Sequence, residues 1–209
     1  LRVEPDLPPS LLLLGTTAFR LRRHNDARVA FERFIEVAPS ELWRTQGLGH
    51  ALYSLGDYAA ARDHYMLVNG VLAGSYEAHR GLGLSLYRLG EYKAAKAALE
   101  KAIELRPNSY EPHAWLSEVL FNSDEYEGAM IAAKRAMELD AFDPRAYFTA
   151  FRVAAELGQD ELATQMETRW RELTDYQAEI TAFDNRLLFE PDNVLLHFAR
   201  MTAHAMRLT

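Results

Sequence analysis

The chain contains no cysteine, so it has neither a disulfide framework nor a thiolate that could bind a metal. It also lacks a long apolar run, because the leucine stretch at 11–14 is far shorter than the roughly 18 residues of a membrane-spanning helix. The chain begins with Leu1 rather than Met, and we therefore expect a partial or processed chain. The compartment stays open between the cytoplasm and, if a signal peptide was removed, the periplasm.

The amino acids that are present have the balance of a globular protein. Of the 209 residues, 49% are hydrophobic and 25% are charged, which argues against intrinsic disorder. The formal net charge of −7 disfavours a nucleic-acid-binding protein, which usually carries a clustered basic surface. Arginines do gather near the N-terminus, but we interpret them as one solvated helix face: Arg20, Arg22, Arg23, Arg28 and Arg33.

A 34-residue repeat is the main signal in the sequence. Internal periods of this length are typical of repeat architectures. Three turn-forming glycines fit it, because Gly56 and Gly90 lie one period apart and Gly158 lies two periods further on, with Asp124 at the intervening position. A column of alanines keeps the same spacing without a break: Ala27, Ala61, Ala95, Ala129 and Ala163.

Within each period the apolar residues recur at helical spacing in two segments separated by a turn. The third unit illustrates this, since Gly90 breaks the first segment and Pro107 ends the second. Small residues such as Gly83 and Ala95 allow the two helix backbones to approach closely. One such hairpin cannot bury its apolar face alone, so the pattern predicts stacked helical hairpins. Leucines at one column, Leu14, Leu48 and Leu82, are predicted to be core.

Residues 76–109 read YEAHRGLGLSLYRLGEYKAAKAALEKAIELRPNS, and this segment resembles the tetratricopeptide repeat (TPR) family nearly throughout. The resemblance covers five units, at 8–41, 42–75, 76–109, 110–143 and 144–177, after an N-terminal extension at 1–7. It implies an all-α fold, a right-handed α-α superhelix of five helix-turn-helix repeats in one solenoid domain. Residues 178–209 lose the register, and we expect about two C-terminal helices there, near 175–189 and 193–208, which belong to a further repeat or stand outside the array.

The sequence shows no catalytic or cofactor motif. It has no phosphate-binding loop, no zinc-binding His-Glu-x-x-His and no nucleophile elbow. His197 and His204 share a helix face but lie roughly 10 Å apart by helix rise, too far for one metal ion. We therefore expect no enzyme activity, no cofactor and no metal site.

In the TPR family the first helix of each pair lines the concave side of the superhelix, and the resemblance places one aromatic column there: Phe19, Tyr53, Tyr87 and Phe121. This ladder has two interpretations, as packing between neighbouring helices or as a ligand-reading surface. The residue types at the positions beside this ladder differ from unit to unit, which is typical of a surface that recognises one particular ligand. The predicted peptide-binding groove comprises Trp43, Gln46, His50, Tyr53, Arg80, Leu84, Tyr87, Arg88, Glu118, Phe121, Asn122, Phe148 and Arg152.

The function predicted from these features is protein binding, as an interaction scaffold that holds a peptide or helical segment of a partner in its concave groove. Two alternatives remain. The first is a dedicated chaperone for a secreted or membrane-associated client, as small bacterial members of this family are. The second is a self-associating structural module, because the last segment is more apolar than the polar outer face that terminal repeats normally present. Nucleic acid and membrane insertion are not expected.

Overall fold

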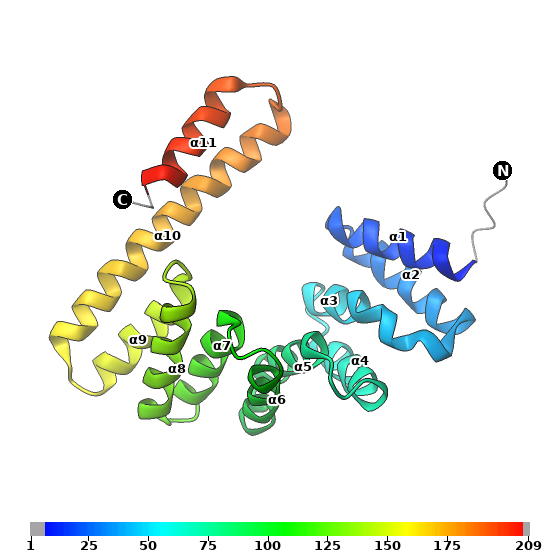
Figure 1. The fold of residues 1–209 in the computed structure, drawn as a ribbon, viewed down its shortest axis with the longest axis horizontal. Coiled ribbons are helices and arrows are strands. Elements are labelled where there is room, and N and C mark those ends of the chain that lie inside the picture. The colour runs from blue at the N-terminus through cyan, green and yellow to red at the C-terminus, as the bar shows by residue number, and fades with distance from the viewer. Residues whose placement is uncertain (1–6, 207–209) are drawn as a thin grey trace.

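The computed structural model describes residues 7–206, and within that range it leaves the side chains of residues 42–44 and 204–206 undescribed. The described residues form helices and turns without a strand, and the helices follow one another in an open arc (Figure 1). The helices are α1 (Pro8–Arg20), α2 (His24–Val37), a 3-10 segment (Pro39–Thr45), α3 (Gln46–Ser54), α4 (Tyr58–Val71), α5 (Tyr76–Arg88), α6 (Tyr92–Leu105), α7 (Tyr110–Phe121), α8 (Tyr126–Leu139), α9 (Pro144–Glu156), α10 (Asp160–Phe189) and α11 (Val194–Met206).

The turns inside the hairpins have the conformation that the glycine spacing predicts. Gly56, Gly90 and Gly158 all have positive φ angles, between 66° and 82°, which glycine adopts without a steric penalty. Asp124 takes the same position between α7 and α8 with a φ of 59°, as Arg22 does between α1 and α2. Asp is one of the residues that tolerates this region, so the missing glycine does not interrupt the repeat.

Helix contact within and between hairpins depends on large rings that pack against glycines. The Tyr65 ring on α4 lies between Gly49 of α3 and Gly81 of α5, and a Cβ at either glycine would come within 2.5 Å of that ring. The Phe31 ring on α2 lies in the same way between Gly15 and Gly47. Each ring therefore fixes the packing of its own hairpin and of the next.

Over the first four units, the small residue on the first helix and its partner on the second change size in opposite directions; the fifth unit, with Phe151 and Glu167, does not follow this trend. The first-helix column reads Gly15, Gly49, Gly83, Ser117 and Phe151, and the corresponding second-helix column reads Phe31, Tyr65, Leu99, Ala133 and Glu167. A Cβ added at Gly83 would lie 2.6 Å from the Leu99 side chain. Because interiors are close-packed, a bulky residue on one helix requires a small one opposite it.

The alanine column is buried as predicted: Ala27, Ala61, Ala95 and Ala129 are fully buried, and Ala163 nearly so. In the leucine column, the first member differs from the others in its burial. Leu82 packs against the core clusters on both sides of it, whereas Leu14 is 57% exposed. The prediction that Leu14 is core is wrong, because no hairpin precedes α1 within the described residues to cover it.

The C-terminal region also differs from the prediction. We expected a separate helix near 175–189, but α10 runs without interruption for 30 residues, from Asp160 to Phe189. No glycine or proline lies inside this stretch, so nothing ends the helix where the repeat register is lost. One further helix, α11, follows Pro191 and packs back on α10 through the buried Leu196 and an ion pair of 2.8 Å between Arg200 and Asp184.

None of the helices in the described part of the chain combines the length and the apolar character needed to cross a membrane.

Candidate binding surface

The first helices of the hairpins line the inner side of the arc. Figure 1 shows α3, α5 and α7 on this side, with α4, α6 and α8 on the outer side. The predicted aromatic ladder lies on these inner helices, near their C-terminal ends: Phe19 on α1, Tyr53 on α3, Tyr87 on α5 and Phe121 on α7. All four side chains are half-buried, and each packs against the core.

Each ladder residue contacts the aromatic residue that begins the second helix of its own hairpin. The ring centroids lie 5.3 Å apart for Phe19 and His24 and 5.2 Å apart for Tyr53 and Tyr58. The same contact repeats further along the array, at 6.0 Å for Tyr87 with Tyr92 and 5.6 Å for Phe121 with Tyr126. These contacts show that the ladder packs inside each hairpin, and the half-buried side chains also keep part of their surface accessible.

The accessible edges are joined to the next hairpin by polar contacts. The Arg88 Nε donates a hydrogen bond of 3.0 Å to the Tyr53 hydroxyl, and the Arg88 guanidinium lies 5.9 Å from the centroid of that ring. The Tyr87 hydroxyl donates a hydrogen bond of 2.7 Å to the Glu118 carboxylate. Burial raises the pKa of Tyr87, and the hydrogen bond to Glu118 raises it further, so this phenol stays protonated.

At the C-terminal end of the ladder, Arg152 of α9 covers the aromatic rings of two helices. Its guanidinium lies 3.8 Å from the Phe121 centroid and 5.4 Å from the Phe148 centroid, within the range of cation–π attraction. Phe148 in turn contacts Trp170 of α10 at 4.8 Å. We call these residues the inner strip: Tyr53, Tyr87, Arg88, Glu118, Phe121, Phe148 and Arg152.

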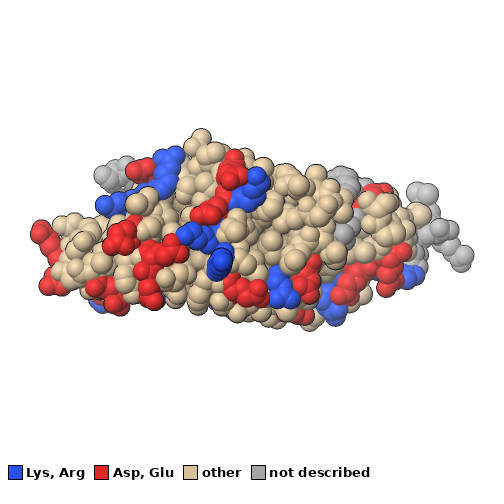
Figure 2. Space-filling model, turned by 90° about the horizontal axis from the view of Figure 1, so that it is seen from below, with Lys and Arg blue, Asp and Glu red and all other residues tan. Residues whose placement is uncertain are grey.

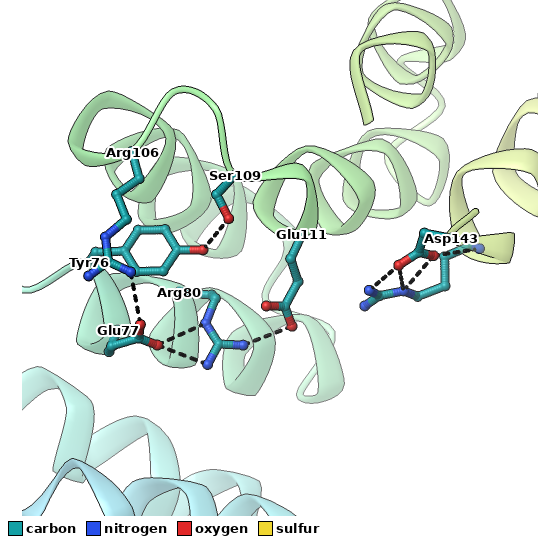
Figure 3. Close-up of polar contacts among 8 residues, drawn as sticks. Tyr76, Glu77, Arg80, Arg106, Ser109, Glu111 and Asp143 are labelled. Atoms are coloured by element: carbon teal, nitrogen blue, oxygen red, sulfur yellow. Dashed lines mark hydrogen bonds and ion pairs between the residues drawn. The ribbon is translucent and has the colours of Figure 1, made fainter. Parts of the chain in front are cut away.

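Arg80 lies at the centre of a charged network beside the inner strip (Figure 3). Its guanidinium bonds to Glu77 on its own helix at 3.0 Å and to Glu111 of α7 at 2.8 Å. Glu77 also pairs with Arg106, whose guanidinium lies over the Tyr76 ring at 4.2 Å. Burial alone would lower the pKa of Arg80, but Glu111 and Glu77 raise it overall, so Arg80 stays charged and joins two repeats.

Four other predicted groove residues have mainly structural contacts. Leu84 is buried in the core, and the Gln46 amide donates to the Ser75 hydroxyl that caps α5. The Asn122 amide donates to the Glu118 carbonyl at the end of α7. His50 contacts the Phe19 and Tyr65 rings, and burial, with a smaller effect of Arg80, lowers its pKa to about 4.

One predicted residue, Trp43, lies outside the described residues, because its side chain is among those that the structure leaves undescribed.

Two side chains that the sequence analysis missed adjoin the inner strip. Trp115 of α7 contacts Tyr87 at 5.5 Å and lies under the Arg145 guanidinium at 5.0 Å. Arg145 itself is held by Asp143, which also caps α9. The column that contains Trp115 holds Leu13, Gly47, Gly81 and Thr149 in the other units, so no aromatic pattern could have marked it.

The outer face has a different character. Figure 2 shows acidic and basic residues interspersed over it, without a large basic patch. A shallow apolar depression between α4 and α6 is lined mainly by Met66, Leu82, Leu86 and the alanines 94, 97 and 98. No group of His, Asp or Glu side chains in the described region is arranged to hold a metal ion.

Comparison with protein families identifies tetratricopeptide repeats in two segments, residues 12–68 and 76–109. No curated protein matches the chain. Among solved structures, "MamA 41-end from Desulfovibrio magneticus RS-1" is similar, with a TM-score of 0.74 and 18% identity over 81% of this chain and 96% of that one. A second is described as "YrrB: a TPR protein with an unusual peptide-binding site", with a TM-score of 0.68 and 18% identity over 95% of this chain and 94% of that one. At these identities the likeness establishes the α-α superhelix.

Proposed function

The chain belongs to the tetratricopeptide repeat family, and we propose that it is a protein-interaction scaffold that binds a peptide or helical segment of a partner protein along its inner strip. The observation that carries the proposal is the inner strip itself. Aromatic rings and guanidinium groups from successive repeats, α3 to α9, are held in fixed positions by one another. Such preorganised groups lose little conformational entropy on binding, and Tyr and Arg are common at binding hot spots.

Two further points support this proposal. The similar YrrB structure is described as having a peptide-binding site, so this architecture has accommodated a peptide in another protein. The ionisable side chains near the strip are engaged in packing contacts: Arg80 pairs with two carboxylates and Glu118 accepts from Tyr87. This arrangement serves recognition rather than proton transfer, and we infer that the chain is not an enzyme.

The experiment that tests the proposal obstructs the inner side of the arc through substitutions at exposed residues, which leave the hydrophobic core unchanged. Ser54 and Ala155 are exposed. Ser54 follows the ladder residue Tyr53 at the end of α3, and Ala155 stands at the ladder position of the fifth unit, near the end of α9. The variant Ser54→Trp/Ala155→Trp fills the inner side with two bulky side chains. The matched control, Ala97→Trp, adds one such side chain to the outer depression beside α6. Each protein serves as bait for affinity capture from a lysate of the source organism, after circular dichroism has confirmed its helix content.

We expect the wild-type chain and Ala97→Trp to retain the same partner, and Ser54→Trp/Ala155→Trp to lose it. Retention by the double variant together with loss by Ala97→Trp would move the binding site to the outer face and refute the proposal.

A specific observation also favours the self-associating module as a second candidate. One face of α11 is exposed and apolar, formed by Val194, Leu195, Phe198 and Met201. Phe189, at the end of α10, is 88% exposed as well. Contiguous exposed apolar surface of this kind commonly marks an interaction site.

Sedimentation equilibrium tests this second candidate. If two copies associate through α11, the apparent mass of the wild-type chain rises above 23.8 kDa with concentration. Phe198→Glu should abolish the rise, whereas Ile131→Glu, an equally drastic change at an exposed apolar residue on α8, should not. A wild-type mass that stays at the monomer value at every concentration would eliminate self-association through α11.

A further inference from the structure

The inner strip carries two arginines that no carboxylate neutralises. The other arginines nearby are paired, Arg80 with Glu77 and Glu111, and Arg145 with Asp143. Arg88 and Arg152 form no ion pair with any described residue, and their contacts are aromatic rings and one phenol. Glu118 also lies on the strip and accepts the hydrogen bond from the neutral Tyr87 phenol, which does not neutralise it, so the strip holds two guanidinium groups and one carboxylate.

The N–H groups of these two arginines point to solvent. Arg88 uses only its Nε, which donates to Tyr53, and Arg152 has no hydrogen bond within the described part of the chain. Arg88 is exposed, and Arg152 is half-buried but has no buried nitrogen that lacks a partner, so the remaining N–H groups are accessible. The Tyr53 hydroxyl holds Arg88, and the Phe121 ring lies 3.8 Å from the Arg152 guanidinium, so both side chains are positioned by the strip. A planar guanidinium fork matches a carboxylate in two parallel hydrogen bonds.

From this geometry we propose that the occupant of the inner strip is an extended acidic segment, with one carboxylate bound by Arg88 and a second bound by Arg152. This inference rests on the proposed function and adds the chemistry of the partner. Apolar side chains between the two acidic residues would lie against Tyr87 and Phe121. The net charge of −7 describes the whole chain and not the strip, where the two arginines outnumber the one carboxylate, Glu118.

The positions of the two arginines set the spacing of the acidic residues. Arg88 lies on α5 and Arg152 on α9, with α7 in contact with both helices. Neighbouring packed helices have axes about 8–10 Å apart, so the two guanidinium groups are separated by roughly 20 Å. An extended chain advances about 3.3 Å per residue, which places the second acidic residue about six positions after the first. A helical partner, at 1.5 Å per residue, would need about 13 positions.

The experiment selects binders from a random peptide library of about 20 residues, displayed on phage without a free C-terminal carboxylate. That length exceeds the span both in extended form and as a helix. Wild-type protein is the bait. Selected peptides are then synthesised with a fluorescent label, and binding is measured by anisotropy. The variants are Arg88→Gln and Arg152→Gln, each made singly, and, as the charge-matched control, Arg135→Gln, which removes one solvent-accessible arginine from the outer helix α8. Peptides with Gln in place of Glu or Asp repeat the test without altering the protein.

We expect selected peptides to share two acidic positions about six apart. Each Arg→Gln change should weaken binding about tenfold or more, as should each acidic-to-Gln change in the peptide, because charge-assisted hydrogen bonds are lost. Arg135→Gln should leave affinity unchanged, and added salt should weaken binding. The Lys variants Arg88→Lys and Arg152→Lys should retain part of the affinity, since they keep the charge but not the planar fork.

Two results overturn the inference in different ways. Binders without acidic enrichment that nevertheless fail to bind Ser54→Trp/Ala155→Trp would refute the acidic partner and leave the proposed function standing. Acidic binders that still bind this blocked variant would place their site elsewhere and refute both. Acidic positions about 13 apart would refute the extended form of the segment.

Discussion

The substitution Gly81→Ala tests how the second and third repeats are held together. A Cβ at Gly81 would lie 2.3 Å from the Tyr65 ring, more than 1 Å closer than ordinary contact. The ring is only 1% exposed, and Gly49 holds its other side, so it has no space into which to move. Overpacking of this kind costs about 1–3 kcal/mol, and a helix gains at most about 1 kcal/mol when alanine replaces glycine. Because the ring is confined on both sides, we take the upper part of that cost, about 2–3 kcal/mol, and expect a net loss of about 1–2 kcal/mol of unfolding free energy.

Urea unfolding followed by circular dichroism at 222 nm measures this loss. Gly70→Ala is the matched control, because Gly70 is an exposed residue of α4 and a Cβ there would contact nothing within 4 Å. It should be neutral or stabilising by up to about 1 kcal/mol. The second variant Tyr65→Leu/Gly81→Ala should lose less than the sum of its single changes. If Gly81→Ala is as stable as the wild-type chain, the ring does not fix the repeat interface and the reasoning is refuted.

Two further predictions concern charge and capping. Burial lowers the pKa of His50 to about 4 from an unfolded value near 6.5, so the unfolded state binds the proton first as pH falls. Unfolding free energy should therefore decrease between about pH 6.5 and 4, by up to about 3 kcal/mol from this residue. His50→Leu introduces the residue that the next repeat has at this position, Leu84. It should make unfolding free energy depend less on pH between about 6.5 and 4, and an unchanged dependence would contradict the role of His50. Asp143→Ala should cost about 1 kcal/mol or more by removing the cap of α9 and the partner of Arg145, and an unchanged midpoint in urea would contradict it.

Much of the fold was predictable because steric rules recur at a fixed period. Positive φ angles at Gly56, Gly90 and Gly158 require residues that tolerate them, so the glycines mark the turns in the sequence. The buried alanine column marks close helix contact in the same way. The end of the array was not predictable, since loss of the repeat register in α10 was not accompanied by loss of helical propensity.

The sequence predicts the candidate site only as sets of equivalent positions that recur in successive repeats. Helical periodicity places Tyr87 and Phe121 on one side of the solenoid, but it does not predict which other side chains they contact. Trp115 and Arg145 escaped notice because each occurs once in its column, and their contact crosses from α7 to α9. The distinction between the paired Arg80 and the unpaired Arg88 likewise depends on carboxylates from a neighbouring helix, which a single unit does not contain.

The central claim is that a partner lies along the inner side of the arc, and site-specific photo-crosslinking in cells tests it most directly. A benzophenone amino acid is placed at Ser54, at Ala155 or, on the outer side, at Ala97. We predict that irradiation yields the same crosslinked partner from Ser54 and Ala155 and none from Ala97. A partner crosslinked from Ala97 alone would contradict the account.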